Sequence, residues 1–289
     1  MFKQVFIILT VLALSAVLSG GVAQAGAPFV TAEGVGGCGF NPFAYLAMTP
    51  GEDGYKVGGI EIAKPRLGAF YVNLNADTVA STKGVDWTTI GIATTLNKRL
   101  EISFGYELVA IGGLDRNTHK YNYGAKLKIL DENAFGTSYL PAISIGTVYK
   151  RTANPLAINL GGRDGFDVYL VATKLITQLP KPILISAGVL STQAHVNGII
   201  GFDKKRTETM FANFDIFPVS MLAFGMEYKM GPDYGNYKDE DYFDLHGCWF
   251  VNKNFTLAAA YTMAGDRRQG PNEGLGLGGG LMLSAQYTF

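Results

Sequence analysis

The chain has 289 residues, of which only 17% are charged and 12% are aromatic; its formal net charge is +0 and its mean hydropathy is +0.15. The balanced charge argues against nucleic acid as a partner, because binding to phosphates requires clustered Lys and Arg. About 25% of residues are charged in an average soluble domain, so the composition favours a membrane protein. Beyond residue 25 no apolar run is long enough for a membrane-spanning helix, which leaves a lipid-facing β-barrel, in which only alternate residues need be apolar.

Residues 1–25 have the three parts of a secretory signal peptide. Lys3 supplies a positive start, residues 5–18 form an apolar run, and residues 23–25 (AQA) form a small-residue cleavage site. We therefore predict export from the cytoplasm, with a mature chain that begins near Gly26. A retained N-terminal anchor is the alternative.

Residues 26–65 lack the regular alternation that follows them. Their glycine-rich stretch at 33–40 (EGVGGCGF) permits close approach of the backbone to a wall. Residues 40–49 have the composition of a strand, but one additional strand would make the total odd. We therefore predict a non-spanning segment that plugs the lumen or caps its periplasmic mouth. A barrel with thirteenth and fourteenth strands is the alternative.

Residues 66–289 alternate with a period of two, which is typical of strands. From 255 to 263, for example, Phe, Leu, Ala, Tyr and Met occupy one face, and smaller residues occupy the other. Most segments have the roughly 9–11 residues that a tilted membrane strand requires. The twelve predicted strands are 66–75, 87–97, 99–111, 119–130, 139–150, 166–177, 182–192, 208–217, 221–230, 241–251, 254–264 and 277–289.

Short and long connections alternate along this barrel region. Short ones lie at 97–99, 178–181, 218–220 and 251–254, whereas polar stretches such as 193–207 are longer. Outer-membrane barrels combine short periplasmic turns with longer outer loops and an even number of strands. We therefore predict a closed antiparallel transmembrane β-barrel of about 12 strands (range 12–14) in the bacterial outer membrane, surrounded by its lipid.

The last strand carries a second indication of the same location. It places Leu281, Leu283, Ala285, Tyr287 and Phe289 on one face and ends in an aromatic residue. This ending resembles the terminal strand that the outer-membrane assembly machinery recognises. That machinery is therefore an expected partner, through Phe289.

Several stretches in chain order resemble one family of proteobacterial outer-membrane proteins, the domain of unknown function 3034. They are EGVGGCGFNPFA at 33–44, DVYLVATKLI at 167–176, HVNGIIGF at 195–202, FGMEYKMGPD at 224–233, YFDLHGCWFVNKNFTLAAAYTMAGD at 242–266 and LSAQYTF at 283–289. The resemblance implies an outer-membrane barrel and brings no substrate or catalytic residue. Cys38 stands where the family's glycine run would lead us to expect Gly.

If the apolar faces meet lipid, the opposite faces line the lumen, because a charge facing lipid near the midplane costs about 2–4 kcal/mol. Either these charges pair across the lumen in a structural network, or they line a polar pore of mixed charge. The predicted lumen-lining residues are Glu101, Glu107, Lys126, Lys128, Glu227, Lys229, Asp244 and His246.

The cysteines and histidines give little sign of chemistry. Cys248 lies on the lumen face, so a disulfide to Cys38 would tether the N-terminal segment to the wall. His246 lies two residues from Cys248, but no further ligand has matching spacing, so we expect no metal. No nucleophile elbow and no close Ser–His arrangement occurs, so we expect no catalytic residue, no cofactor and no enzyme activity.

Two functions remain open, together with a soluble alternative. The first is a narrow channel for a small solute of unknown identity. The second is a non-conducting barrel, structural or an assembly partner, that the N-terminal segment plugs. A barrel of twelve strands lies between filled eight-strand barrels and open sixteen-strand porins, so its size does not decide. A soluble periplasmic β-protein is the third possibility.

Overall fold

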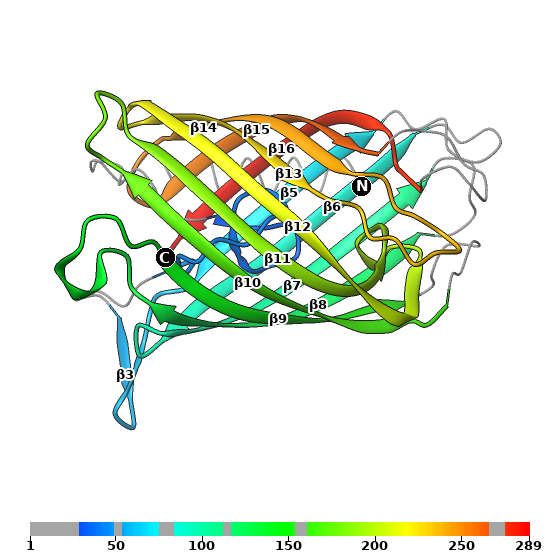
Figure 1. Cartoon of the computed structure of the whole chain (residues 1–289), viewed down its shortest axis with the longest axis horizontal. Coiled ribbons are helices and arrows are strands. Elements are labelled where there is room, and N and C mark those ends of the chain that lie inside the picture. The colour runs from blue at the N-terminus through cyan, green and yellow to red at the C-terminus, as the bar shows by residue number, and fades with distance from the viewer. Residues whose placement is uncertain (1–28, 49–53, 75–83, 112–116, 154–160, 266–274) are drawn as a thin grey trace.

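In the computed structural model, twelve antiparallel strands form one closed barrel, because the last strand, β16, pairs with the first, β5 (Figure 1). The structure describes residues 29–48, 54–74, 84–111, 117–153, 161–265 and 275–289, so the predicted signal peptide lies outside the described residues. The wall consists of β5 (Arg66–Leu74), β6 (Val85–Leu96), β7 (Leu100–Ile111), β8 (Thr118–Leu130), β9 (Ala142–Ala153), β10 (Asp164–Ile176), β11 (Ile183–His195), β12 (Gly201–Val219), β13 (Leu222–Lys229), β14 (Tyr242–Phe250), β15 (Phe255–Ala264) and β16 (Gly279–Thr288).

The prediction of a closed barrel with twelve strands is confirmed, and the predicted ranges differ mainly at two strands. β9 begins at Ala142 and not at 139, because Pro141 lacks the N–H that a central strand donates. β12 begins at Gly201 and not at 208. Its first part carries the exposed Lys204 and Arg206, a composition that predicts a loop.

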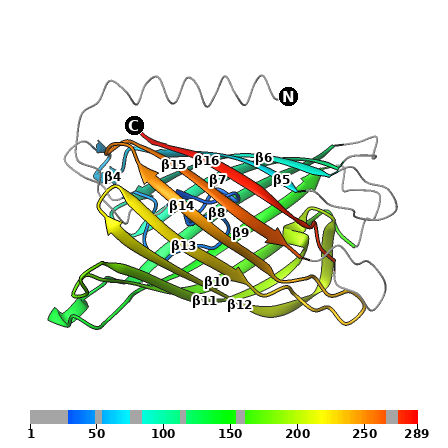
Figure 2. The same ribbon diagram turned by 90° about the horizontal axis from the view of Figure 1, so that it is seen from above.

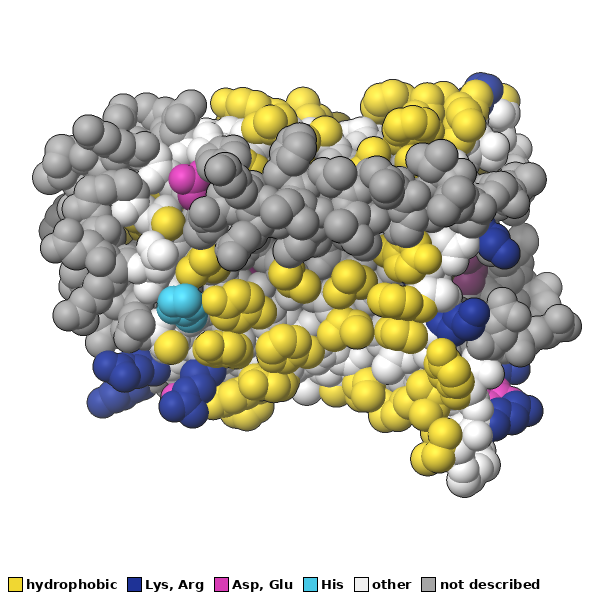
Figure 3. All heavy atoms as spheres, turned by 180° about the vertical axis from the view of Figure 1, so that it is seen from behind, with side chains coloured by type: hydrophobic (Ala, Val, Ile, Leu, Met, Phe, Trp, Pro, Cys, Tyr) yellow, Lys and Arg dark blue, Asp and Glu magenta, His cyan; other side chains and the backbone are white. Residues whose placement is uncertain are grey.

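The outer surface of the barrel carries an apolar belt (Figure 3). Period-two alternation produces it, because every second side chain of each strand points outward. A closed barrel with an apolar belt and a polar interior is the structure with which a chain crosses an outer membrane, and this is where the protein resides. Among the described residues, no helix is long and apolar enough to cross a membrane. Exposed belt residues include Ile102, Leu127, Ile145, Leu170, Ile185, Val189, Met210, Phe224, Met226, Leu245, Tyr261 and Leu281.

The two ends of the barrel differ. One end has the short connections, such as 97–99 and 251–254, and the C-terminus. A hairpin of β3 (Tyr55–Val57) and β4 (Ile60–Ile62) extends from this end and joins the wall through β6 (Figure 1). A 3-10 turn, η1 (Ala134–Gly136), lies in the connection between β8 and β9.

At the other end, the connection between β11 and β12 folds into the barrel. It contains a second 3-10 turn, η2 (Val196–Gly198), and all three of its residues are buried. Val196 and Ile199 belong to an apolar cluster that also contains Trp87 of β6. The sequence predicts a polar outer loop at residues 193–207. The structure corrects this, because part of the segment extends the strands and the rest packs inside the barrel.

Candidate functional site: the lumen and its plug

Residues 29–48, which we call the plug, lie inside the barrel (Figures 1 and 2). The plug contains a small hairpin of β1 (Phe29–Val30) and β2 (Gly36–Gly37). Each of its residues is buried or half-buried. The plug has little secondary structure of its own, so the wall must bind many of its backbone groups.

Three inward glycines allow the plug to lie directly against the wall. Gly68, Gly91 and Gly105 are direct cross-strand partners on β5, β6 and β7, and we call them the glycine row. A Cβ atom at Gly105 would lie 2.4 Å from the carbonyl oxygen of Glu33. A Cβ atom at Gly91 would lie 2.9 Å from the Cα of Gly34. Any larger residue in this row would therefore force the plug away.

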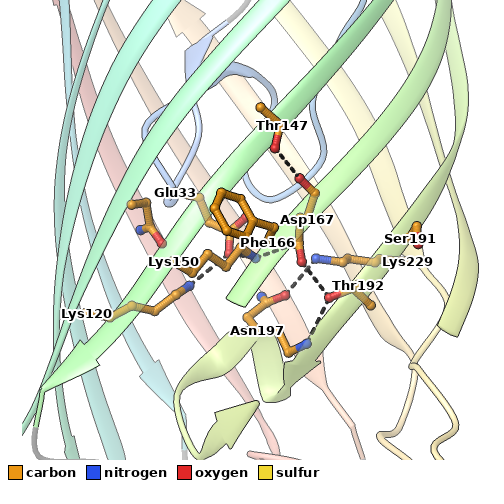
Figure 4. A network of polar contacts seen from close by, with 12 residues as sticks. Glu33, Lys120, Thr147, Lys150, Phe166, Asp167, Ser191, Thr192, Asn197 and Lys229 are labelled. Carbon is orange, nitrogen blue, oxygen red and sulfur yellow. Dashed lines mark hydrogen bonds and ion pairs between the residues drawn. The ribbon is translucent and has the colours of Figure 1, made fainter. Parts of the chain in front are cut away.

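Glu33, at the tip of the plug hairpin, lies among lysines of the wall (Figure 4). Its Oε1 is 2.8 Å from Nζ of Lys120 and also contacts Nζ of Lys150. Lys120 pairs in addition with Glu107 at 2.8 Å, and Lys150 pairs with Asp167 at 2.6 Å. Burial raises the pKa of Glu33, but the two ammonium groups outweigh it and hold the pKa well below its usual range. Glu33 therefore binds the wall as a carboxylate.

A second ion pair of the wall binds backbone groups of the plug. Glu101 and Lys126 lie 3.1 Å apart on the neighbouring strands β7 and β8. Glu101 accepts hydrogen bonds from the N–H groups of Gly36 (2.7 Å) and Ala47 (2.6 Å). Lys126 donates to the carbonyl oxygens of Gly36 and Tyr45, both at 2.8 Å. The pair thus fixes both ends of the stretch from 36 to 47.

On the side of β12 to β14, a carboxylate binds the turn of the plug. Glu227 accepts hydrogen bonds from three successive backbone N–H groups, those of Gly39, Phe40 and Asn41. Beside it, the imidazole of His246 lies between two further carboxylates. Its Nδ1 is 2.7 Å from Asp244 and its Nε2 is 2.9 Å from Asp215.

Comparison with known proteins defines the family. The model of one family, described as a protein of unknown function (DUF3034), matches residues 26–273. The chain belongs to this family. No curated protein matches it.

Solved structures resemble this DUF3034 protein in fold. The KdgM porin has a TM-score of 0.50 at 9% identity, covering 78% of this chain and 99% of its own. Omp33 of Acinetobacter baumannii has a TM-score of 0.46 at 11% identity, covering 79% and 99%. The NanC porin has a TM-score of 0.44 at 10% identity, covering 78% and 98%. At these identities the likeness to KdgM shows a shared fold alone.

The structure places the eight predicted lumen-lining residues of this DUF3034 protein on the inward face or at its rim. Lys128 lies at the rim and pairs with Asp131 at 2.6 Å. Lys229 donates a hydrogen bond of 2.6 Å to Asn197 of the inward-folded connection. The other six, Glu101, Glu107, Lys126, Glu227, Asp244 and His246, are buried.

Several residues that bind or surround the plug were not among those predicted. Lys120 shares the alternating face of Lys126, so this pattern could have identified it. Lys150 and Asp167 lie at the ends of predicted strands, where the pattern is least clear. Asp215 lies on the buried face of the predicted strand 208–217, two strands from His246, so the alternation could have identified it too. Glu33 joins the site only because the plug enters the lumen. The unpredicted residues are Glu33, Lys120, Lys150, Asp167 and Asp215.

The disulfide predicted between Cys38 and Cys248 is not formed, because both residues are free thiols. Both thiols are buried in one apolar cluster that includes Phe217. The Sγ atom of Cys38 lies 3.7 Å from Nε2 of His246. The plug therefore meets the wall here through a thiol and an imidazole.

Proposed function

We propose that this protein is an outer-membrane barrel that its own N-terminal segment keeps closed in the resting state. The observation that carries the proposal is the binding of the plug by charged groups of the wall on opposite sides. Glu101 and Lys126 bind it from β7 and β8, and Glu227 binds it from β13. These groups would line the pore if the lumen were open, and here they are buried against backbone.

The inward connection between β11 and β12 supports the same proposal. Its buried residues Val196, Ile199 and Ile200 occupy the interior at the end with the long connections. Ions that entered from that end would meet apolar side chains before they reached the plug.

A narrow channel for small polar solutes is the second candidate. The wall behind the plug carries carboxylates and ammonium groups, which water and a polar solute could contact if the plug moved. Most of the contacts that bind the plug to these groups are hydrogen bonds and ion pairs, which water can replace. In this candidate the plug is a gate.

Single-channel conductance of the full-length protein in planar bilayers tests the proposal. We expect no stable open level for the wild type. The variant Glu227→Gln loses the charge that binds three N–H groups of the plug, so we expect brief openings. The matched control, Glu208→Gln on the neighbouring strand, changes an exposed residue and should remain closed. A steadily conducting wild type would contradict a closed resting state and favour the open channel.

A further inference from the structure

The charged residues of the lumen form two sets that differ in their balance. On the side of β7 to β10, the acidic residues Glu33, Glu101, Glu107 and Asp167 have lysine partners within ion-pair distance. On the side of β12 to β14, three carboxylates lie together. In the described part of the chain, the only cationic side chain within ion-pair distance of them is His246.

This acidic cluster consists of Asp215, Glu227 and Asp244, and each is at least nine-tenths buried. If all three carboxylates are ionised, the cluster has an excess of negative charge even with a protonated His246. One carboxylate oxygen of Asp215 and one of Asp244 have no hydrogen-bond partner. Because a buried, unpaired carboxylate costs several kcal/mol, its charge must be compensated at this place, either by a proton or by a cation.

The sulfur of Cys38, a soft metal ligand, lies beside this acidic cluster. Cys38 of the plug, Asp215 of β12 and His246 of β14 each offer one ligand atom, and these atoms lie within 4.8 Å of one another. We propose that these three residues bind a transition-metal ion of the Zn²⁺ type. Thiolate, imidazole and carboxylate are ligands of zinc, whereas Mg²⁺ and Ca²⁺ take oxygen ligands.

One of the two distances to His246 already fits a tetrahedral ion, and the other is shorter than such an ion requires. With bonds of about 2.0–2.3 Å, tetrahedral geometry places ligand atoms roughly 3.3–3.8 Å apart. Cys38 Sγ and His246 Nε2 are 3.7 Å apart. The Nε2 of His246 and Oδ1 of Asp215 are 2.9 Å apart, so a small rotation of the Asp215 carboxylate admits the ion.

The surroundings of His246 match those of a metal-binding histidine. Its Nδ1 contacts Oδ1 of Asp244 at 2.7 Å, which leaves Nε2 directed at Cys38 and Asp215. A carboxylate on the second ring nitrogen is the usual partner of a zinc-bound histidine, because it fixes the ring and raises its basicity.

A small cavity, lined largely by apolar side chains, adjoins two of the three ligands, Cys38 and Asp215, and leaves room for a fourth ligand. Its volume is about 30 Å³, and Cys38, Asp215 and Cys248 contribute to its lining. Such a cavity admits a water molecule. A metal ion here would join the plug to two strands of the wall. This consequence for closure rests on the proposed function, whereas the metal site itself does not.

Metal content and spectroscopy of the full-length, thiol-reduced protein test the proposal. After incubation with Zn²⁺ and removal of unbound metal, we expect one tightly bound Zn²⁺ per folded barrel. With Co²⁺ in its place, we expect a thiolate-to-metal absorption band. Cys38→Ser should abolish the band, and His246→Gln should abolish stoichiometric binding.

Two further variants make the test specific. Asp244→Asn keeps all three ligands but weakens the outer contact of His246, so we expect affinity to fall by about 10–100-fold. Cys248→Ser removes the other thiol of the cavity and should retain the band. Absence of stoichiometric binding to the folded wild type would overturn the site, as would a band that survives Cys38→Ser. If the metal binds but the wild type conducts, the site stands and the closed resting state falls.

Discussion

Glu33 shows how much one buried charge contributes to the plug. It bridges Lys120 and Lys150, and its replacement by Gln would leave both lysines with one acidic partner each. Removal of one member of a buried ion pair costs about 3–5 kcal/mol when the partner is left uncompensated, and the remaining partners of Lys120 and Lys150 reduce this cost. We expect Glu33→Gln to increase hydrogen exchange of backbone amides in residues 29–48, measured by mass spectrometry, while the strands remain protected.

A matched control exists in the β3–β4 hairpin. Glu61 also bridges two lysines, Lys56 at 3.3 Å and Lys98 at 3.7 Å, but it is partly exposed. Exposed pairs contribute about 0–1 kcal/mol, so Glu61→Gln should leave exchange unchanged. Equal effects of the two variants would contradict an anchoring role for Glu33.

At the residue scale, the sequence predicts which charges face inward but not which partners they find. Glu101 and Lys126 follow from the alternation of strands that lie next to each other in the chain. The contact of Glu33 with Lys150 joins residues 117 positions apart, and it depends on the register, the closure and the path of the plug. None of these is encoded in a local pattern.

The glycine row shows how single strands accommodate the plug. Gly105→Ala would place a Cβ atom 2.4 Å from the Glu33 carbonyl oxygen, and that contact is backbone, which cannot rotate away. Ala is tolerated in a strand, so the barrel should fold and the plug should shift. We expect higher hydrogen exchange in residues 29–48 and, in planar bilayers, conducting events that the wild type lacks.

Gly247→Ala is the control for that variant. Gly247 is also in a strand, on the outward face of β14, and the nearest atoms to its added Cβ would be in the ring of Phe224, at 3.3 Å. We expect plug exchange and conductance to match the wild type. If the two alanine variants behaved alike, strand weakening and not loss of close contact would explain Gly105→Ala.

At the element scale, the period-two alternation predicted the twelve strands, because contact with lipid requires apolar side chains on one face of each strand. The alternation did not predict the structure of residues 193–207, because lipid does not constrain the side chains of this segment. There β12 extends with Lys204, Lys205 and Arg206 exposed, and Ile199 turns inward and joins the apolar cluster that contains Trp87. Similarly, residues 26–65 lacked the alternation, so the path of residues 29–48 through the interior could only be inferred by exclusion, and the hairpin of β3 and β4 outside the barrel was not predicted.

At the scale of the whole molecule, the apolar belt predicts that hydrocarbon surrounds the barrel. Leu170, in the middle of β10, and Leu179, in the short connection after it, are both 45% exposed. In water, Arg at either position would have a small effect, because both side chains already contact solvent. In a bilayer, Leu170 faces hydrocarbon, and Arg near the midplane costs about 2–4 kcal/mol.

We therefore expect Leu170→Arg to lower the free energy of unfolding by about 2–4 kcal/mol in lipid vesicles. Leu179→Arg should leave this free energy nearly unchanged, because the short connection lies in water beyond the end of the strand. Guanidinium titrations of both variants, followed by tryptophan fluorescence, measure the difference. Since the two leucines have equal exposure, only hydrocarbon around the barrel can separate the variants, and equal free energies would place β10 outside the bilayer.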